Sequence, residues 1–263
     1  MVGRSLAAFR ERNKQRRVRA TQLDPSLDLW EDRKNELSEF YRVSSEEIDA
    51  IHRGPKRHEA FSDVDSDASL FTAYQERTMV ATISHMLSYT RFDDALCLMK
   101  TTDRAYRGRP RNEVRVLDYG CSIADYSLIF AASGYSIILC DIEDGNLELG
   151  KWRFARRGLP FEAIPVNLDN LYPKFEDIDV VIAGEVLEHV RDPLTATRNI
   201  FEGLREGGFL WVSRYPMVEV ELDDAHPDHL TEAYEARKDV EEFIRLKFEQ
   251  QPIERGYLFR KVS

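Results

Sequence analysis

Long apolar runs and patterned cysteines are both missing from this chain of 263 residues. No uninterrupted apolar run approaches the roughly 20 residues needed to cross a bilayer. No apolar segment follows the basic N-terminus, as one would in a secretory signal. The three cysteines, Cys97, Cys121 and Cys140, show neither metal-binding nor disulfide spacing. Together with a hydrophobic content of 43%, these absences predict a cytoplasmic protein with an ordinary core and no membrane span.

Negative charge dominates the chain except at its N-terminus. The formal net charge is −10, whereas residues 1–20 hold seven arginine and lysine residues against the single acid Glu11. Such a basic arm can bind nucleic acid or an anionic surface, and it can equally be a frayed terminal helix. Because the acidic remainder repels a phosphate backbone, a small or glycan-like substrate is favoured over RNA or DNA.

Helical patterns fill residues 1–110. Ser44 and Glu47 form a capping box at the start of a short helix. Apolar residues at helical spacing predict one longer helix through Leu70 and Leu87. A domain boundary is expected near Pro110, so residues 1–110 would form a helical extension and substrate cap, with the basic arm at 1–20. Residues 111–263 would form the second domain.

Strands and helices alternate from residue 111 onward, as a parallel sheet requires. The strand 114–118 ends in Asp118 and leads through a turn of small residues into a helix that begins at Asp125. The next strand is followed by Asp141. Further strands are expected at 161–166, 178–183 and 209–214, a helix at 231–247, and a last hairpin at 253–255 and 257–262. This order predicts a doubly wound sheet with its ligand loops at the carboxyl edge.

The turn after the first strand and the acid after the second one point to a nucleotide-like ligand. A strand, tight turn and helix bring backbone N–H groups close to a ligand, and an acid at the next strand tip can accept both ribose hydroxyls. The segments resemble the class I S-adenosylmethionine (SAM) dependent methyltransferases, most closely the branch with E-V-L-E-H-V-x-D-P, which stands here at 185–193. The resemblance covers about residues 113–263. It implies a Rossmann-like seven-stranded sheet with an antiparallel last strand.

The first loop departs from the family pattern D-x-G-C-G-x-G. Ser122 and Ala124 stand where the second and third glycines are usual. Glycine is favoured there because it tolerates positive φ and lets the backbone approach a ligand. Ser and Ala are the next smallest residues, so binding can survive, although a decayed cofactor site stays an alternative. The loop also lacks the G-x-G-x-x-G of a dinucleotide site, which argues against a dehydrogenase.

The resemblance implies a role for each part of the cofactor site. Asp141 would hold the ribose, Asp118 and Gly120 would frame the methionine end, and Asp125 would meet the amino group. Asn167 would face the adenine amine. The implied cofactor-binding residues are Asp118, Gly120, Ser122, Asp125, Asp141, Ile142, Asn167, Leu168, Gly184 and Glu185.

An E-x-x-E-H triplet follows the strand 178–183. Glu185, Glu188 and His189 have the spacing that places three side chains on one face of a helical turn. The pattern resembles ubiquinone-biosynthesis O-methyltransferases and small-RNA 2′-O-methyltransferases, which add a later histidine. That resemblance implies Mg²⁺ or Mn²⁺ on Glu185, Glu188, His189 and His229, with His226 as the alternate, and a metal that activates the substrate hydroxyl. In the metal-free alternative Glu188 caps or pairs, and His189 packs or acts as a general base.

These residues predict a SAM-dependent methyltransferase that acts on a small or medium polar acceptor at a hydroxyl oxygen, with Glu188, His189 and His229 as the catalytic set. Transfer would be direct and in line. Three alternatives stay open: a metal-dependent RNA 2′-O-methyltransferase that uses the basic arm, an N-methyltransferase, and a non-catalytic scaffold. The N-terminal helices and residues 215–230 are expected to cover the acceptor, with Phe71, Tyr74, Tyr89 and Tyr215 as candidate lining residues.

Overall fold

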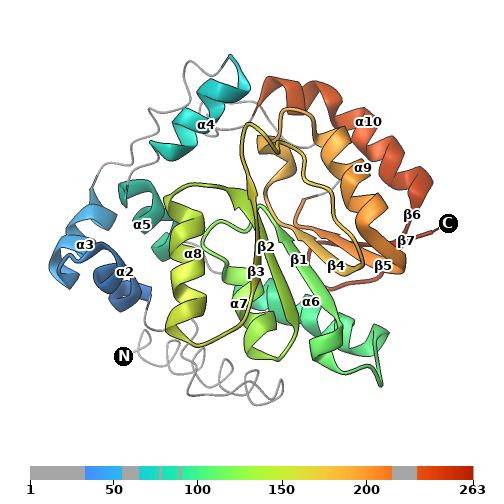
Figure 1. Cartoon of the computed structure of the whole chain (residues 1–263), viewed down its shortest axis with the longest axis horizontal. Helices are drawn as coiled ribbons and strands as arrows, with labels where there is room; N and C mark the ends of the chain where they lie inside the picture. The colour runs from blue at the N-terminus through green and yellow to red at the C-terminus, as the bar shows by residue number, and fades with distance from the viewer. Residues whose placement is uncertain (1–32, 55–64, 77–78, 89–90, 215–229, 263) are drawn as a thin grey trace, which may run out of the picture.

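A seven-stranded sheet stands at the centre of the computed structural model, in the order β3-β2-β1-β4-β5-β7-β6 (Figure 1). The model describes residues 33–54, 65–76, 79–88, 91–214 and 230–262. The strands are β1 (Arg115–Tyr119), β2 (Ser136–Ile142), β3 (Glu162–Val166), β4 (Ile178–Ala183), β5 (Leu204–Val212), β6 (Phe248–Gln251) and β7 (Tyr257–Lys261). The helices are α2 (Arg33–Tyr41), α3 (Ser45–Arg53), α4 (Asp67–Gln75), α5 (Met79–Ser88), α6 (Phe92–Ala105), α7 (Asp125–Ala132), α8 (Gly145–Arg156), α9 (Pro193–Gly203) and α10 (Thr231–Lys247), with short 3₁₀ turns η2 (Arg111–Glu113) and η3 (Leu187–His189).

The strand directions confirm the predicted fold class. Strands β1 to β5 pair in parallel, whereas β7 is antiparallel to both β5 and β6. Helices α6 and α7 bury one face of the sheet and α9 and α10 bury the other. Because the central strands of the sheet are covered on both faces, their sequences are nearly continuous apolar runs. Among the described residues, no helix has the length and apolar content of a membrane span.

The single long helix expected through Leu70 and Leu87 is wrong, because the structure has two helices there. Helix α4 ends at Gln75 and α5 begins at Met79, with 77–78 outside the described residues. The two apolar stretches bury against different partners. Leu70 packs with Leu230 and Ala233, near the start of α10, whereas α5 packs against α2 and α3. One apolar pattern therefore serves two separate contact surfaces.

The first strand of the expected C-terminal hairpin is also misplaced. The strand expected at 253–255 lies earlier, at β6, directly after α10. Pro252 explains the difference, since proline has no backbone N–H to give to the ladder and ends the strand. Strand β7 begins at Tyr257, where it was expected.

Helices α2, α3 and α5 pack against α8 and the loop between β1 and α7. Leu37 of α2, Ile48 of α3 and Ile83 of α5 form one apolar cluster with Ile123 and Leu149. The capping box of α3 is confirmed: the Ser44 amide donates to Glu47 Oε2 at 2.7 Å, and the Glu47 amide donates to Ser44 Oγ at 3.2 Å. Helix α6 shares its core with α7. The division at residue 110 stays a prediction.

Asp179, in β4, holds the amino-terminal edge of the sheet together. Its side chain is 2% exposed and accepts hydrogen bonds from Arg109 Nη1 at 2.6 Å and from the Arg115 amide at 2.8 Å. We expect Asp179→Ala to lower the free energy of unfolding by about 3 kcal/mol, because the Arg115 amide, Arg109 and Arg205 all lose an acceptor. Urea unfolding measures this loss. The control Glu162→Gln, which removes an exposed ion pair to Arg115, should change stability by less than about 0.5 kcal/mol.

Candidate functional site

The loop between β1 and α7 is held in an unusual backbone conformation. Gly120, Ser122 and Ala124 have φ of 73°, 48° and 62°. A Cβ on Gly120 would lie 2.3 Å from Cγ2 of Val186, so this glycine is needed for close approach as well as for its dihedral. Ser122 and Ala124 adopt the left-handed conformation that glycine tolerates freely, at about 1–3 kcal/mol each for a non-glycine residue. The loop therefore has three left-handed residues, of which only Gly120 is a glycine.

The Asp141 carboxylate lies beside this loop. Its Oδ2 accepts from the Ser122 amide at 2.5 Å and its Oδ1 from the Ile142 amide at 2.7 Å. Burial and the neighbouring charge of Asp144 raise the pKa of Asp141 to about 7. Asp144 itself accepts from the Asn146 and Leu147 amides and so caps α8. The Asp141 carboxylate thus lies between the first loop and the N-terminus of α8, and its role as a ribose acceptor stays a prediction.

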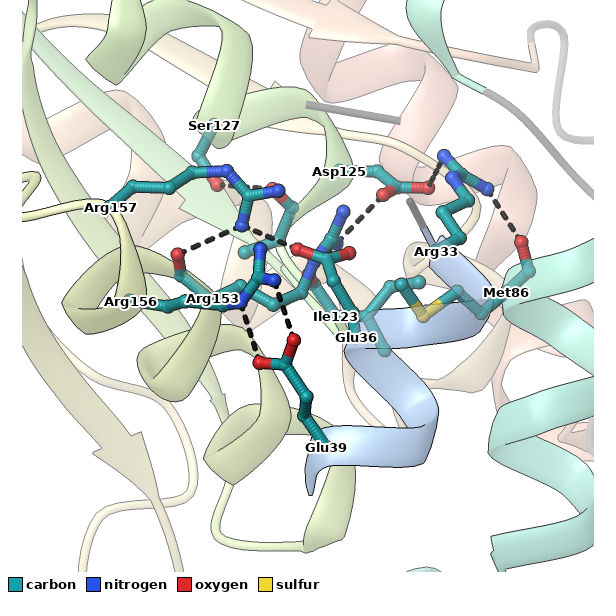
Figure 2. Close-up of polar contacts among 11 residues, drawn as sticks. Arg33, Glu36, Glu39, Met86, Ile123, Asp125, Ser127, Arg153, Arg156 and Arg157 are labelled. Carbon is teal, nitrogen blue, oxygen red and sulfur yellow. Dashed lines mark hydrogen bonds and ion pairs between the residues drawn. The ribbon is translucent and has the colours of Figure 1, made fainter. Parts of the chain in front are cut away.

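Asp118 and Asp125 are both engaged with the protein. Asp118 is buried and accepts from the Ser127 amide at 3.2 Å; burial raises its pKa to about 7. Asp125 accepts from Arg153 Nη1 at 2.8 Å and from Arg33 Nη2 at 2.7 Å (Figure 2). Burial acts to raise the pKa of Asp125, but these two arginines hold it below its ordinary value. A cofactor role for either carboxyl stays a prediction.

The ends of β2 and β3 bring the expected adenine residues together. Ile142 pairs with Val166 in the sheet, and Asn167 follows directly. Asn167 Oδ1 accepts from the amides of Asp169 and Asn170, and its Nδ2 donates to Glu143. Leu168 is 56% exposed, which is unusual for a large apolar side chain. Both ends of the Asn167 amide thus already have protein partners, and an adenine-binding role for Asn167 and Leu168 stays a prediction.

The turn after β4 differs from the helical turn that the E-x-x-E-H spacing predicts. Glu185 has a φ of 55°, and the short 3₁₀ turn η3 begins only at Leu187. The prediction that Glu185, Glu188 and His189 share one helical face is therefore wrong. Glu185 pairs instead with Arg214, at 3.1 Å, and with Arg91, at 4.0 Å. Its pKa is lowered, since these arginines outweigh the opposing effect of burial.

The other expected metal ligands do not complete a cluster in the part of the chain that the structure describes. Glu188 is 6% exposed, and its Oε1 has no hydrogen-bond partner among the described residues. His189 is half-buried in η3, and its amide donates to the Val186 carbonyl at 2.9 Å. His226 and His229 lie outside the described residues, and no group of three histidine, cysteine or acidic side chains suitable for a metal occurs within them.

Sequence reasoning missed the arginines of the site. Arg153 of α8 and Arg33 of α2 both pair with Asp125, the first residue of α7, and Arg91 and Arg214 pair with Glu185. One signal was available for Arg153, since it stands four residues after the buried Leu149 on the inner face of α8. Of the candidate lining residues, Phe71 is buried and Tyr74 packs against Leu70, Leu230 and Ala233, whereas Tyr89 and Tyr215 lie outside the described residues.

Comparison with known proteins agrees with this geometry. Residues 117–212 match a family model described as a methyltransferase domain. The ubiquinone biosynthesis O-methyltransferase of Parvibaculum lavamentivorans is 29% identical over 105 residues, which make up 40% of this chain and 42% of that protein. The enzyme of the same name from Ruegeria pomeroyi is 33% identical over 100 residues, 38% of this chain and 40% of that protein. The matched segment thus spans less than half of each relative.

Proposed function

Because this chain belongs to the class I SAM-dependent methyltransferase family, we propose that it transfers a methyl group from SAM to a hydroxyl oxygen of a small or medium polar acceptor. The observation that carries the proposal is the Asp141 carboxylate, set between the Ser122 amide and the N-terminus of α8. The choice of oxygen as the acceptor atom follows the names of the two relatives, which are both O-methyltransferases.

The proposed cofactor site uses the loops at the carboxyl ends of β1, β2 and β3. SAM supplies an electrophilic methyl group on a sulfonium sulfur. Asp141 would accept the ribose hydroxyls, and Ile142 and Leu168 would contact the adenine ring. The backbone of Gly120 and Ser122 would border the methionine end, where the small side chains leave room for close approach.

The proposed acceptor site lies at the turn after β4. In the transfer, the acceptor oxygen forms a bond to the methyl carbon as the bond from that carbon to sulfur breaks. The hydroxyl proton must leave, and His189 in η3 is the residue that we assign to receive it. The protein would contribute mainly by holding the oxygen in line with the reacting bond.

We favour transfer without a metal on Glu185. Two arginines already pair with this carboxylate, and their positive charges oppose a divalent cation at the same oxygens. A metal held by Glu188, His189 and His229 remains the alternative form of the same activity. Its signature would be a heat of Mg²⁺ or Mn²⁺ binding to chelator-treated protein that is lost in Glu188→Ala.

Calorimetric titration of the full chain with S-adenosylhomocysteine tests the proposal. Micromolar binding, followed by transfer of labelled methyl groups to hydroxyl-bearing but not amine-bearing small molecules, is the expected result. Transfer to amines alone would move the acceptor to nitrogen. Salt-sensitive RNA binding that is lost on deletion of residues 1–20 would favour the RNA alternative. If the product binds under none of these conditions, the chain is a scaffold.

The affinity for S-adenosylhomocysteine is expected to rise with pH through neutrality. Ribose hydroxyls donate best to an ionised carboxylate, and burial raises the pKa of Asp141 to about 7. If only the ionised form binds, the dissociation constant should be about tenfold larger at pH 6 than at pH 8. Titrations at both pH values measure this ratio, and a flat profile in the wild-type protein would contradict it.

The stability of the ligand-free protein should fall as the pH rises, whereas the affinity for S-adenosylhomocysteine should increase. Because the pKa of Asp141 and of Asp118 lies above the unfolded value, the folded state holds extra protons between about pH 4 and pH 7. Their contribution to the free energy of unfolding is therefore present at low pH and is lost as the pH rises through about 7. Thermal unfolding in the two buffers separates this effect from binding.

A further inference from the structure

A buried charge network joins the N-terminal helix α2 to the cofactor loop (Figure 2). Arg153 of α8 and Glu36 of α2 are both 0% exposed, and Arg153 Nε donates to Glu36 Oε2 at 3.1 Å. Arg157 forms an ion pair with the same carboxylate. Arg33 of α2 reaches past this pair to Asp125, the first residue of α7. The network therefore spans three helices that are distant in sequence.

The same arginine also holds the backbone of the loop. Arg153 Nη1 donates to the carbonyl of Ile123 at 2.5 Å and to Asp125 Oδ1 at 2.8 Å. Ile123 lies between Ser122 and Ala124, the two non-glycine residues at positive φ. Non-glycine residues persist in this conformation only when their surroundings impose it. The guanidinium is placed to impose it, because it binds the carbonyl between them.

Removing Arg153 leaves the remaining charges in balance. Glu36 keeps its ion pair with Arg157, and Asp125 keeps its ion pair with Arg33. A substitution at Arg153 therefore leaves no buried carboxylate unpaired, which would otherwise be strongly destabilising. The substitution does remove the hydrogen bonds of Arg153 to Glu36, to Asp125 and to the Ile123 carbonyl, and the last of these is the one made to the backbone of the loop. The loop conformation can thus be tested separately from the fold.

We propose that Arg153, held by Glu36 of α2, is a positioning residue that keeps loop 120–124 in its cofactor-binding conformation and so makes SAM affinity depend on the N-terminal helix. The inference rests on the proposed function, since it assigns the loop to SAM. Arg153 takes over the role of the two missing glycines: it stabilises the left-handed backbone that glycine would adopt unaided.

The test compares Arg153→Met with Arg156→Met in the full chain. Arg156 also joins α8 to α2, through an ion pair with Glu39 at 2.8 Å, and is therefore the matched control. We expect Arg153→Met to raise the dissociation constant of S-adenosylhomocysteine about tenfold. Without the arginine, the positive φ of Ser122 and Ala124 is no longer stabilised, so the loop populates its binding conformation less often. Arg156→Met should change it by less than about twofold. Glu36→Gln should weaken binding in the same direction as Arg153→Met.

Glycine at positions 122 and 124 should rescue binding in Arg153→Met. Such a rescue is not expected if Arg153 only stabilises the fold. In a Ser122→Gly, Ala124→Gly background, Arg153→Met should change the dissociation constant by less than about threefold, because glycine needs no support at positive φ. Amide hydrogen exchange of residues 120–125 should be faster in Arg153→Met than in wild type, and unchanged in Arg156→Met.

Three outcomes would overturn the inference: wild-type affinity in Arg153→Met, equal weakening in both backgrounds, or unchanged exchange in the loop. Failure of the wild-type chain to bind S-adenosylhomocysteine would instead defeat the proposed function. The exchange measurement would then still report whether Arg153 holds the loop.

Discussion

Asp141→Asn is expected to raise the dissociation constant for S-adenosylhomocysteine by about 100-fold at pH 8. The ionised carboxylate can accept both ribose hydroxyls, and a hydrogen bond to a charged group contributes about 1.5–3 kcal/mol. Loss of about 3 kcal/mol corresponds to the expected factor. The amide that replaces the carboxylate also turns an NH₂ group toward donors, because the Ser122 and Ile142 amides both point at this side chain. Calorimetric titration of the variant gives the constant directly.

Stability distinguishes a binding role for Asp141 from a structural one. Burial raises the pKa of this carboxyl to about 7, so keeping it ionised in the fold is unfavourable above that pH. Asp141→Asn removes that cost but leaves one of the two facing amides without an acceptor. These effects oppose each other, so the melting temperature at pH 8 should stay close to that of the wild type while binding weakens about 100-fold. The exposed neighbour provides the control: Glu143→Gln should stay within about threefold of wild-type affinity. Wild-type affinity in Asp141→Asn would show that Asp141 is not part of the binding site.

The sheet was predictable because its signals are local. The helix predicted from Asp125 begins at that residue, and the strand 178–183 has the predicted bounds. Apolar strands covered on both faces, separated by helices of ordinary length, leave few arrangements other than a doubly wound sheet. The position of Asp141 at the carboxyl edge follows from that topology. These features needed no knowledge of contacts between distant segments.

The Glu36–Arg153 contact and the turn after β4 were not predictable from the sequence. The first depends on segments distant in the chain, and the second depends on strained backbone. Glu36 and Arg153 are 117 residues apart in the chain, and no local pattern links an acid on one helix to an arginine on another. The prediction that the three expected metal ligands share one helical face was wrong for a different reason. Its spacing rule assumes a helical turn, whereas Glu185 adopts a left-handed φ and pairs with two arginines. Strain of this kind is set by the surrounding structure and is common at functional sites.

His189→Ala is expected to lower kcat by about 10³-fold once an acceptor is known, while the dissociation constant for S-adenosylhomocysteine stays within about threefold. A general base acts on the acceptor hydroxyl and makes no contribution to product binding, so kcat and affinity should separate. His189 lies in η3, directly after the β4 turn that carries Glu185. Single-turnover methyl transfer with labelled SAM measures the chemical step.

The pH profile decides between a base and a packing role for His189. If His189 accepts the proton, the acidic limb of the kcat profile should vanish in His189→Ala, and added imidazole should restore part of the rate. A packing role would lower kcat without changing the shape of the profile. A loss smaller than about tenfold in His189→Ala, with the acidic limb intact, would transfer the role to another group. If Mg²⁺ raised the wild-type rate and Glu188→Ala abolished that increase, the metal-assisted form would replace the general-base form, because the cation would then lower the pKa of the acceptor hydroxyl.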